Sequence, residues 1–121
     1  MSQAAKVAQE FGYDEVNVNC GCPSNKVVKG AFGAILMKDP HLVARIVAEM
    51  RTQVTIPVTV KCRLGVDDLD TWDNIVNFVR IVSMEGGCSK FIIHARKAHL
   101  KGLNPKQNRT IPPLKYPWVF Q

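Results

Sequence analysis

The sequence predicts an α/β fold in which parallel β-strands alternate with α-helices. Helix-like and strand-like patterns alternate along the chain, and such alternation is typical of parallel strands joined by helical crossovers. Each predicted strand begins with apolar residues and ends with polar ones, which is the pattern of strands that build a site at their carboxyl edge. With 121 residues, 46% of them hydrophobic, the chain is long enough for one modest domain with a core.

The first half of the chain predicts two helices around one strand. Gly12 ends the first helix, and the strand that follows runs into the turn Cys20-Gly21-Cys22-Pro23-Ser24. Residues 29–37 are then punctuated by glycine, and Asp39 and Pro40 provide an N-cap and a first helical position. The elements predicted here are a helix over 4–11, a strand over 16–19 and a helix that starts at 40 and includes the amphipathic stretch 42–50.

The second half predicts two more strands around a third helix. β-Branched residues indicate the first of these strands, an acidic loop follows over 65–70, and Gly86-Gly87 ends the helix. Residues 97–117 are basic, contain proline and are expected to form a long structureless loop, which in a compact domain is usually functional. The elements predicted here are a strand over 57–63, a helix over 71–85, a strand over 91–94 and the start of a helix at 116–121.

The net charge of +6 is concentrated at the C-terminal end of the chain. Residues 1–90 contain ten Lys or Arg and ten Asp or Glu, whereas residues 91–121 contain six basic residues and no acidic one. This segregation indicates either a polyanionic partner such as a nucleic acid or a basic loop that is simply solvated. The six basic residues are Arg96, Lys97, Lys101, Lys106, Arg109 and Lys115.

Polar side chains occur in pairs at the ends of the three predicted strands. The pairs are Asn17 with Asn19, Lys61 with Arg63, and His94 with Arg96. A spacing of two residues places both members of a pair on one face of a strand, and parallel strands bring their carboxyl ends to one edge of the sheet. One solvated strand end would be unremarkable, but three such pairs favour a site at this edge.

Cys22 is the candidate reactive residue of this edge. It follows the first strand in a Gly-Cys-Pro turn, in which Gly21 permits an unusual backbone angle and Pro23 stiffens the chain. An unperturbed thiol has a pKa of about 8.5, so it carries its proton at neutral pH and suits a proton donor. The alternative is a buried structural cysteine, which is the commoner fate of this residue type.

The other cysteines are expected to be reduced thiols that hold no metal. A zinc site is the alternative interpretation, with the candidate ligands Cys20, Cys22, Cys62 and His94. The Cys-x-Cys spacing is unusual for zinc. Cys62 also has the parity opposite to Lys61 and Arg63, so it should face away from the site. Cys88 precedes the third strand, at the opposite edge of the sheet, and is expected to be structural.

Lys61 and His94 each allow two interpretations. Lys61 is either a solvated lysine or a positive charge beside a cofactor that becomes anionic on reduction. His94 is either a packed core residue or a ring that contacts a ligand. Gly30 and Gly33 match neither phosphate-loop pattern and are expected to shape the loop after Cys22.

Four segments together carry a specific combination of motifs. They are residues 17–24 (NVNCGCPS), 30–37 (GAFGAILM), 58–65 (VTVKCRLG) and 92–97 (IIHARK). This combination resembles the signature of tRNA-dihydrouridine synthases, and the resemblance covers essentially the whole chain. Gly102-Leu103, Asn108-Arg109 and 111–114 (IPPL) are similar to the subgroup that acts on positions 20 and 20a of the tRNA D-loop.

The resemblance implies a partial (β/α)8 TIM barrel of about three βα units. Residues 1–121 would be a fragment of a flavin-binding catalytic domain, without the ends of the barrel and without the C-terminal helical domain. It also implies the reduction of uridine to 5,6-dihydrouridine in tRNA. NADPH reduces FMN, the flavin passes hydride to C6 of the uracil, and Cys22 gives a proton to C5.

The resemblance also assigns roles to the other residues at the strand ends. Lys61 and His94 match FMN-contacting residues, Arg63 is a candidate near the flavin, and Asn19 matches a residue beside the substrate base. The basic segment over 97–117 is expected to bind tRNA phosphates. The residues expected on the substrate side are Asn19, Arg96, Lys97, Lys106, Asn108 and Arg109.

Two alternatives remain open. A flavin enzyme that acts on a free pyrimidine, such as a dihydroorotate-type dehydrogenase, also has a cysteine before proline after a strand, but it has no need of six cations. A truncated chain that only binds RNA, or has no function, is the other. The sequence predicts no membrane span and no protein partner, and a cytoplasmic location unless a missing N-terminus targets an organelle.

Overall fold

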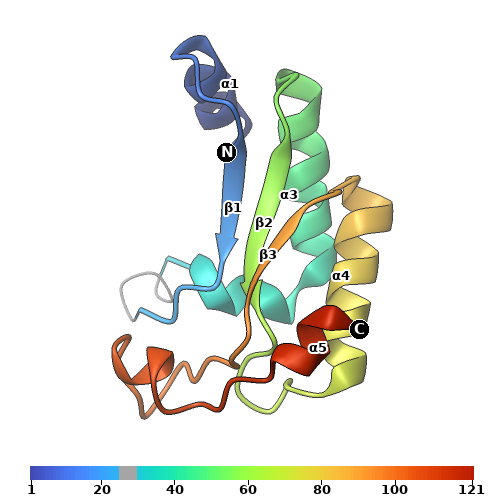
Figure 1. The fold of residues 1–121 in the computed structure, drawn as a ribbon. Helices are drawn as coiled ribbons and strands as arrows, with labels where there is room; N and C mark the ends of the chain where they lie inside the picture. The colour runs from blue at the N-terminus through green and yellow to red at the C-terminus, as the bar shows by residue number, and fades with distance from the viewer. Residues whose placement is uncertain (25–29) are drawn as a thin grey trace.

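The protein is a three-stranded parallel sheet covered on one face by helices (Figure 1). The computed structural model describes residues 1–24 and 30–121. Its elements are α1 (Ser2–Glu10), β1 (Val16–Cys20), the 3-10 helix η1 (Gly33–Lys38), α3 (Pro40–Gln53), β2 (Val58–Arg63), α4 (Trp72–Gly86), β3 (Phe91–His94), the 3-10 helix η2 (Gln107–Arg109) and α5 (Tyr116–Phe120). The predicted α/β alternation is confirmed, as are the three strands. Of the glycine-punctuated segment at 29–37, residue 29 lies outside the described residues.

The strands pair in the order β1-β2-β3, and both pairs are parallel. β1 and β3 therefore form the two edges, and the helices α3 and α4 are the crossovers between neighbouring strands. The loops that follow the three strands gather at the carboxyl end of the sheet (Figure 1). This arrangement is consistent with an arc of a (β/α)8 barrel.

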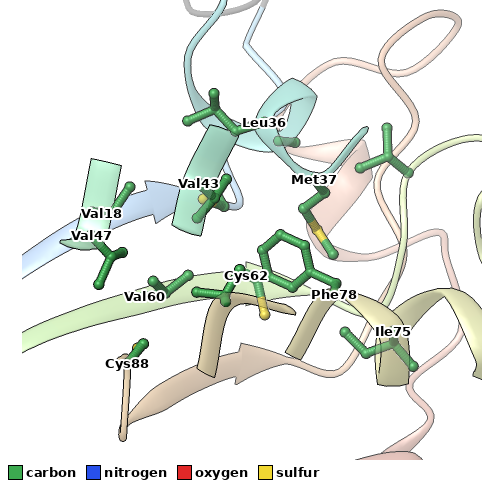
Figure 2. Packing of buried hydrophobic residues seen from close by; sticks show 14 of the residues in the cluster. Val18, Leu36, Met37, Val43, Val47, Val60, Cys62, Ile75, Phe78 and Cys88 are labelled. Carbon is green, nitrogen blue, oxygen red and sulfur yellow. The ribbon is translucent and has the colours of Figure 1, made fainter. Parts of the chain in front are cut away.

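The core lies between the sheet and the helices. Alternate residues of the strands, such as Val18, Val60 and Cys62, point into it, and Figure 2 shows them within one apolar cluster with residues of α3 and α4. Phe78 of α4 is 2% exposed. Its replacement by alanine would cost about 3–5 kcal/mol of stability, because a cavity would replace the ring. Since alternate strand residues face opposite sides, the other face is left for polar side chains.

The helix boundaries follow the predicted signals. The Asp39 carboxylate accepts a hydrogen bond from the Leu42 amide at 3.1 Å, with Pro40 in the first turn, and Thr71 caps α4 in the same way. Gly87 ends α4 with φ +74°, a conformation that favours glycine. No helix in the described part of the chain is both long and apolar enough to cross a membrane.

The expectation of a structureless loop over 97–117 was wrong. The segment contains η2 and the start of α5, and Ala98 bridges to Val66 of the acidic loop. Its backbone is tied at both ends, because the Ala98 amide donates to Gly65 and the Lys115 amide donates to Ala95. These bonds satisfy backbone groups that regular secondary structure would otherwise satisfy.

Candidate active site

Four of the six paired polar residues gather at the carboxyl end of the sheet, namely Asn19, Lys61, Arg63 and His94. Asn17 is bound to Thr59 instead, and Arg96 is bound to His94 and Pro112. On the face away from the helices, Asn19 is the register partner of Lys61, and Arg63 is the register partner of His94. A cleft of about 210 Å³ opens at this point. It is lined by Asn19, Gly21, Cys22, Pro23, Lys61, Arg63, His94, Pro105 and Arg109, and it borders Cys62, which is itself 0% exposed and belongs to the core. Residues from all three strand ends therefore share one cleft, as the sequence pattern predicted.

The Cys22 turn is held by hydrogen bonds to every backbone polar group of residues 21 and 22. The Asn19 Oδ1 accepts from the Gly21 amide at 2.9 Å and from the Cys22 amide at 3.2 Å. The Gly21 carbonyl accepts from Arg63 Nε at 2.9 Å, and the Cys22 carbonyl accepts from the Ala34 amide at 2.8 Å. The thiol of Cys22 is thus carried on a fixed backbone and is only half-buried.

The expectation of an unusual backbone angle at Gly21 was wrong. Gly21 does not have a positive φ, and a Cβ added there would meet Asn19 Oδ1 at 3.8 Å, an ordinary contact. The unusual angle occurs instead at Gly33, with φ +70°, just before the Ala34 amide that binds the Cys22 carbonyl. Ala31, two residues earlier, also has a positive φ, of 57°. The predicted role of Gly30 and Gly33 in the loop after Cys22 concerns residues 25–29 as well, which lie outside the described residues.

The other three cysteines lie in the core. Burial raises the pKa of Cys20 and the pKa of Cys62 to about 12 each, so both thiols stay protonated at physiological pH. The Cys88 thiol is buried and donates to the Lys90 carbonyl at 3.2 Å. The predicted parity of Cys62 is confirmed, and the four residues considered as zinc ligands are split between the core and the cleft.

His94 is bound by Arg96. Nη1 of Arg96 lies 3.2 Å from Nε2 of His94, and Nε of Arg96 donates to the Pro112 carbonyl at 2.9 Å. Burial lowers the pKa of His94, and the nearby charges of Arg63, Arg96 and Lys61 lower it further. His94 is therefore a neutral ring at physiological pH.

Arg63 is the buried cation of the site. Its residue is 4% exposed, and its guanidinium donates to the backbone carbonyls of Gly21, Asn108 and Lys97. Burial lowers the pKa of Arg63, and the charge of Arg96 lowers it further. Among the described residues no carboxylate pairs with this guanidinium.

The cleft is electropositive. Lys61, Arg63 and Arg109 line it, and no acidic residue of the described chain does so. The Lys61 side chain is exposed at the cleft surface. A concave surface lined by one sign of charge concentrates ligands of the opposite sign, so the arrangement suits an anion.

The six basic residues of the C-terminal segment fall into two groups. Lys97 is paired with Asp70 at 2.9 Å and also donates to the Asp67 carbonyl, while Arg96 is bound as described above. The Lys115 ammonium lies 4.5 Å above the Trp118 ring. The residues whose side chains are exposed to solvent are Lys101, Lys106 and Arg109.

Asn108 is fully buried at 0% exposure. Its side chain accepts from the His99 amide at 2.8 Å and donates to the His99 carbonyl at 3.0 Å, closing the loop between them. A further contact reaches the Asn104 carbonyl at 3.2 Å. Asn108 therefore has no exposed surface for a direct contact with RNA. Its side chain stabilises the loop between residues 99 and 108.

The acidic loop over 65–70 binds the basic C-terminal segment, and this contact was not predicted from the sequence. Asp67 has a positive φ of 50°, and its carboxylate accepts from the Leu100 amide at 2.9 Å and pairs with Lys38. With Asp70 on Lys97, this loop anchors the start of the basic segment. The signal that was available is the opposite charge of segments 65–70 and 96–101.

The sequence of this chain matches a known protein family over its whole length. The family described as dihydrouridine synthase (Dus) matches residues 1–121. A tRNA-dihydrouridine(20/20a) synthase of Vibrio parahaemolyticus is 57% identical over 121 residues, which is 100% of this chain and 37% of that protein. The protein of the same name from Synechocystis is 53% identical over 100% of this chain and 36% of its own length. The one from Escherichia coli K12 is 55% identical over 100% of this chain and 35% of its own length.

This chain thus spans about a third of the length of the relatives it matches. The match nevertheless runs over all 121 residues and includes the three strand ends, the Cys22 turn and the basic segment. The chain therefore belongs to the dihydrouridine synthase family.

Proposed function

We propose that this chain supplies the proton-donating part of a flavin site that reduces uridine to 5,6-dihydrouridine in the D-loop of tRNA. The observation that carries the proposal is a half-buried Cys22 thiol on a fixed turn, facing an electropositive cleft. The names of the relatives support positions 20 and 20a of the tRNA as the targets. Residues 1–121 would form about three of the eight βα units of the catalytic barrel.

The residues of the cleft fit a flavin mononucleotide. Lys61 and His94 would hold it, because the exposed ammonium and the neutral ring offer donors at the cleft without a competing carboxylate. Arg63, which was expected near the flavin, lines the same cleft but donates to three backbone carbonyls instead. FMN, when reduced by NADPH, supplies the hydride that is added to C6 of the uracil. The positive charge of Lys61 stabilises negative charge on any ligand in the cleft.

Cys22 holds the proton that completes the reduction. The S–H bond breaks and a C5–H bond forms, while the C5=C6 double bond of the uracil becomes a single bond. The thiolate that remains is reprotonated from water. The turn keeps the sulfur in place during this step, and a positioned proton donor typically contributes about 10²–10⁴-fold to the rate.

The substrate side of the cleft is made by Asn19 and the basic segment. The Asn19 amide nitrogen makes no hydrogen bond within the described residues and is free to donate to a base that has left its stack. Lys106 and Arg109 are exposed and would bind phosphates. Three further residues would act indirectly, without touching the substrate. Arg96 binds His94, and the loop is held by Lys97 and Asn108.

A competition between substrates tests this function. The experiment uses a full-length chimera in which residues 1–121 replace the matching segment of the Vibrio parahaemolyticus relative. After reduction with NADPH, the chimera should be reoxidised by unmodified tRNA, with formation of dihydrouridine, and should not be reoxidised by free uracil. The oxidised chimera should not be reduced by dihydroorotate. Turnover of a free pyrimidine without tRNA would instead support the alternative of a small-molecule flavin enzyme.

A further inference from the structure

We propose that Arg63 is a positioning residue that couples the place of the Cys22 thiol to the fold of the basic loop, defined as residues 96–109. The proposal rests on the proposed function in taking Cys22 as the proton donor. It assigns to Arg63 a role toward the protein backbone rather than toward the flavin or the base.

The guanidinium of Arg63 bridges two loops with two different nitrogen atoms. Nε donates to the Gly21 carbonyl at 2.9 Å, in the turn that follows β1. Nη1 donates to the Asn108 carbonyl at 2.8 Å and lies 3.4 Å from the Lys97 carbonyl, both in the basic loop. Because a guanidinium is planar and rigid, the two loops cannot shift independently while both contacts hold.

Neither water nor a carboxylate of the described residues competes with the backbone carbonyls for the Arg63 guanidinium. Arg63 is 4% exposed, so water has little access to the guanidinium. Within the described part of the chain, its hydrogen-bond acceptors are the three backbone carbonyls, and no carboxylate draws the charge elsewhere. A buried cation that loses such acceptors is left unsatisfied, and that penalty keeps both contacts in place.

The Gly21 contact bears directly on the thiol. The carbonyl of Gly21 belongs to the peptide that links it to Cys22, and Asn19 Oδ1 holds the amide side of the same peptide. With both sides held, this peptide cannot rotate, so the Cα–Cβ bond of Cys22 keeps its direction. A misplacement of about 1 Å at a reacting group costs on the order of 10²-fold in rate.

The Asn108 contact links the thiol to the loop. The buried Asn108 side chain fastens the loop to His99, and the carbonyl of the same residue receives the Arg63 hydrogen bond. A change in the loop at residue 108 therefore moves an acceptor of Arg63. Since Arg109 is the next residue and faces the cleft, RNA bound there and the thiol are joined through one side chain.

The test begins with Arg63→Lys in the full-length chimera with its flavin bound. Lysine keeps the charge but has a single nitrogen, so it cannot serve both carbonyls. Three quantities are measured: the rate of Cys22 alkylation by iodoacetamide, resolved by peptide mass spectrometry, the rate of flavin reduction by NADPH, and the rate of reoxidation by tRNA. Arg51→Lys is the matched control, because Arg51 also contacts a backbone carbonyl, that of Gly86, away from the cleft.

We expect Arg63→Lys to alkylate at Cys22 several-fold faster and to be reoxidised by tRNA about 10–100-fold more slowly, with flavin content and NADPH reduction near those of the parent. Arg51→Lys should match the parent in all three. Alkylation and reoxidation within twofold of the parent would overturn the proposal. So would loss of flavin or slow NADPH reduction, since Arg63 would then act on the cofactor.

A double-mutant cycle tests the coupling itself. Asn108→Ala should speed alkylation of Cys22 in the parent but change it little when Arg63→Lys is already present. Equal effects in both backgrounds, or no effect in the parent, would overturn the proposal. If Arg63→Lys does not fold, the effect of Asn108→Ala on Cys22 alkylation in the parent decides whether the proposal holds. Alkylation needs no RNA, so a parent that never reacts with tRNA would refute the proposed function and leave this measurement valid.

Discussion

Arg96 donates a hydrogen bond to His94, with 3.2 Å between Nη1 and Nε2. A guanidinium has only N–H groups, so Nε2 of His94 is the acceptor and the ring proton lies on Nδ1. The guanidinium is fixed in turn by the Pro112 carbonyl. Arg96 therefore selects the His94 tautomer that carries the ring proton on Nδ1.

The first prediction concerns the state of His94. Nitrogen-15 NMR of the full-length chimera should show a neutral His94 ring protonated at Nδ1, with a pKa below the ordinary 6.5. Arg96→Leu should abolish the preference for one tautomer and raise the pKa only in part, because burial is the largest cause of the shift. Arg51→Lys, a substitution away from the cleft, should leave the His94 signals as they are in the parent.

The sign of the pH effect follows from the same shift. Because the pKa of His94 is lowered by folding, the unfolded chain takes up the proton at a higher pH than the folded chain does. The contribution of His94 to stability is therefore complete above pH 6.5 and declines as the pH falls below it. A His94 signal that titrates above 6.5, or a ring protonated at Nε2, would contradict this account.

The second prediction concerns the cofactor. Lys61→Ala and His94→Ala should each lower the flavin content of the purified chimera or slow its reduction by NADPH, because both side chains line the cleft. Cys62→Ser is the matched control, since its side chain is adjacent in sequence but lies in the core. Flavin content and reduction rates that are the same in all four proteins would remove Lys61 and His94 from the site.

The third prediction concerns the affinity for tRNA and its dependence on salt. Neutralising Lys106 and Arg109, which are exposed, should flatten the slope of log affinity against log salt concentration by about one for each residue, or somewhat less. Lys97→Gln should leave the slope nearly unchanged, because Asp70 already neutralises Lys97. Equal effects of all three substitutions would show that the pairing does not persist when RNA is bound.

The sequence was sufficient to predict the strands, the helix caps and the shared edge of the sheet. These features depend on local signals, such as Asp39 before Pro40, and on the two-residue period of a strand. The same period placed Cys62 in the core and Lys61 in the cleft. Such signals act between neighbours in sequence or follow from regular pairing, so a single chain displays them.

The roles of the loop residues could not be predicted in this way. Asn108 and Lys97 were expected to bind substrate, yet one is buried against His99 and the other is paired with Asp70 across 27 positions of sequence. The carbonyl partners of Arg63 are likewise 34 to 45 positions away. Backbone acceptors have no signature in the residue type that carries them, so contacts of this kind are visible only in the folded chain.

The fourth prediction concerns residues 1–121 expressed alone. Within residues 1–24 and 30–121, β1 and β3 are each paired on one side only, and the face opposite the helices leaves Ile92 41% exposed. Unpaired edges and exposed apolar groups favour aggregation, and the burial that is missing is large beside a typical domain stability of about 5–15 kcal/mol. An absorbance spectrum of the purified chain should show no flavin. A yellow monomer that unfolds cooperatively would contradict this prediction.

The fifth prediction tests the central role of Cys22. In the full-length chimera, Cys22→Ala should bind flavin and be reduced by NADPH as the parent is, because neither step uses the thiol. Cys20→Ala is the matched control: it removes a thiol two residues away that is buried in the core with a pKa of about 12, so turnover should remain near that of the parent.

The decisive measurement is a single turnover in which the NADPH-reduced chimera is mixed with unmodified tRNA without oxygen, and flavin absorbance and dihydrouridine are followed together. The parent and Cys20→Ala should be reoxidised with formation of dihydrouridine. Cys22→Ala should be slower by about 10²–10⁴-fold, the usual loss when a positioned proton donor is removed. Reoxidation of Cys22→Ala at the rate of the parent, with the same yield of dihydrouridine, would contradict the account.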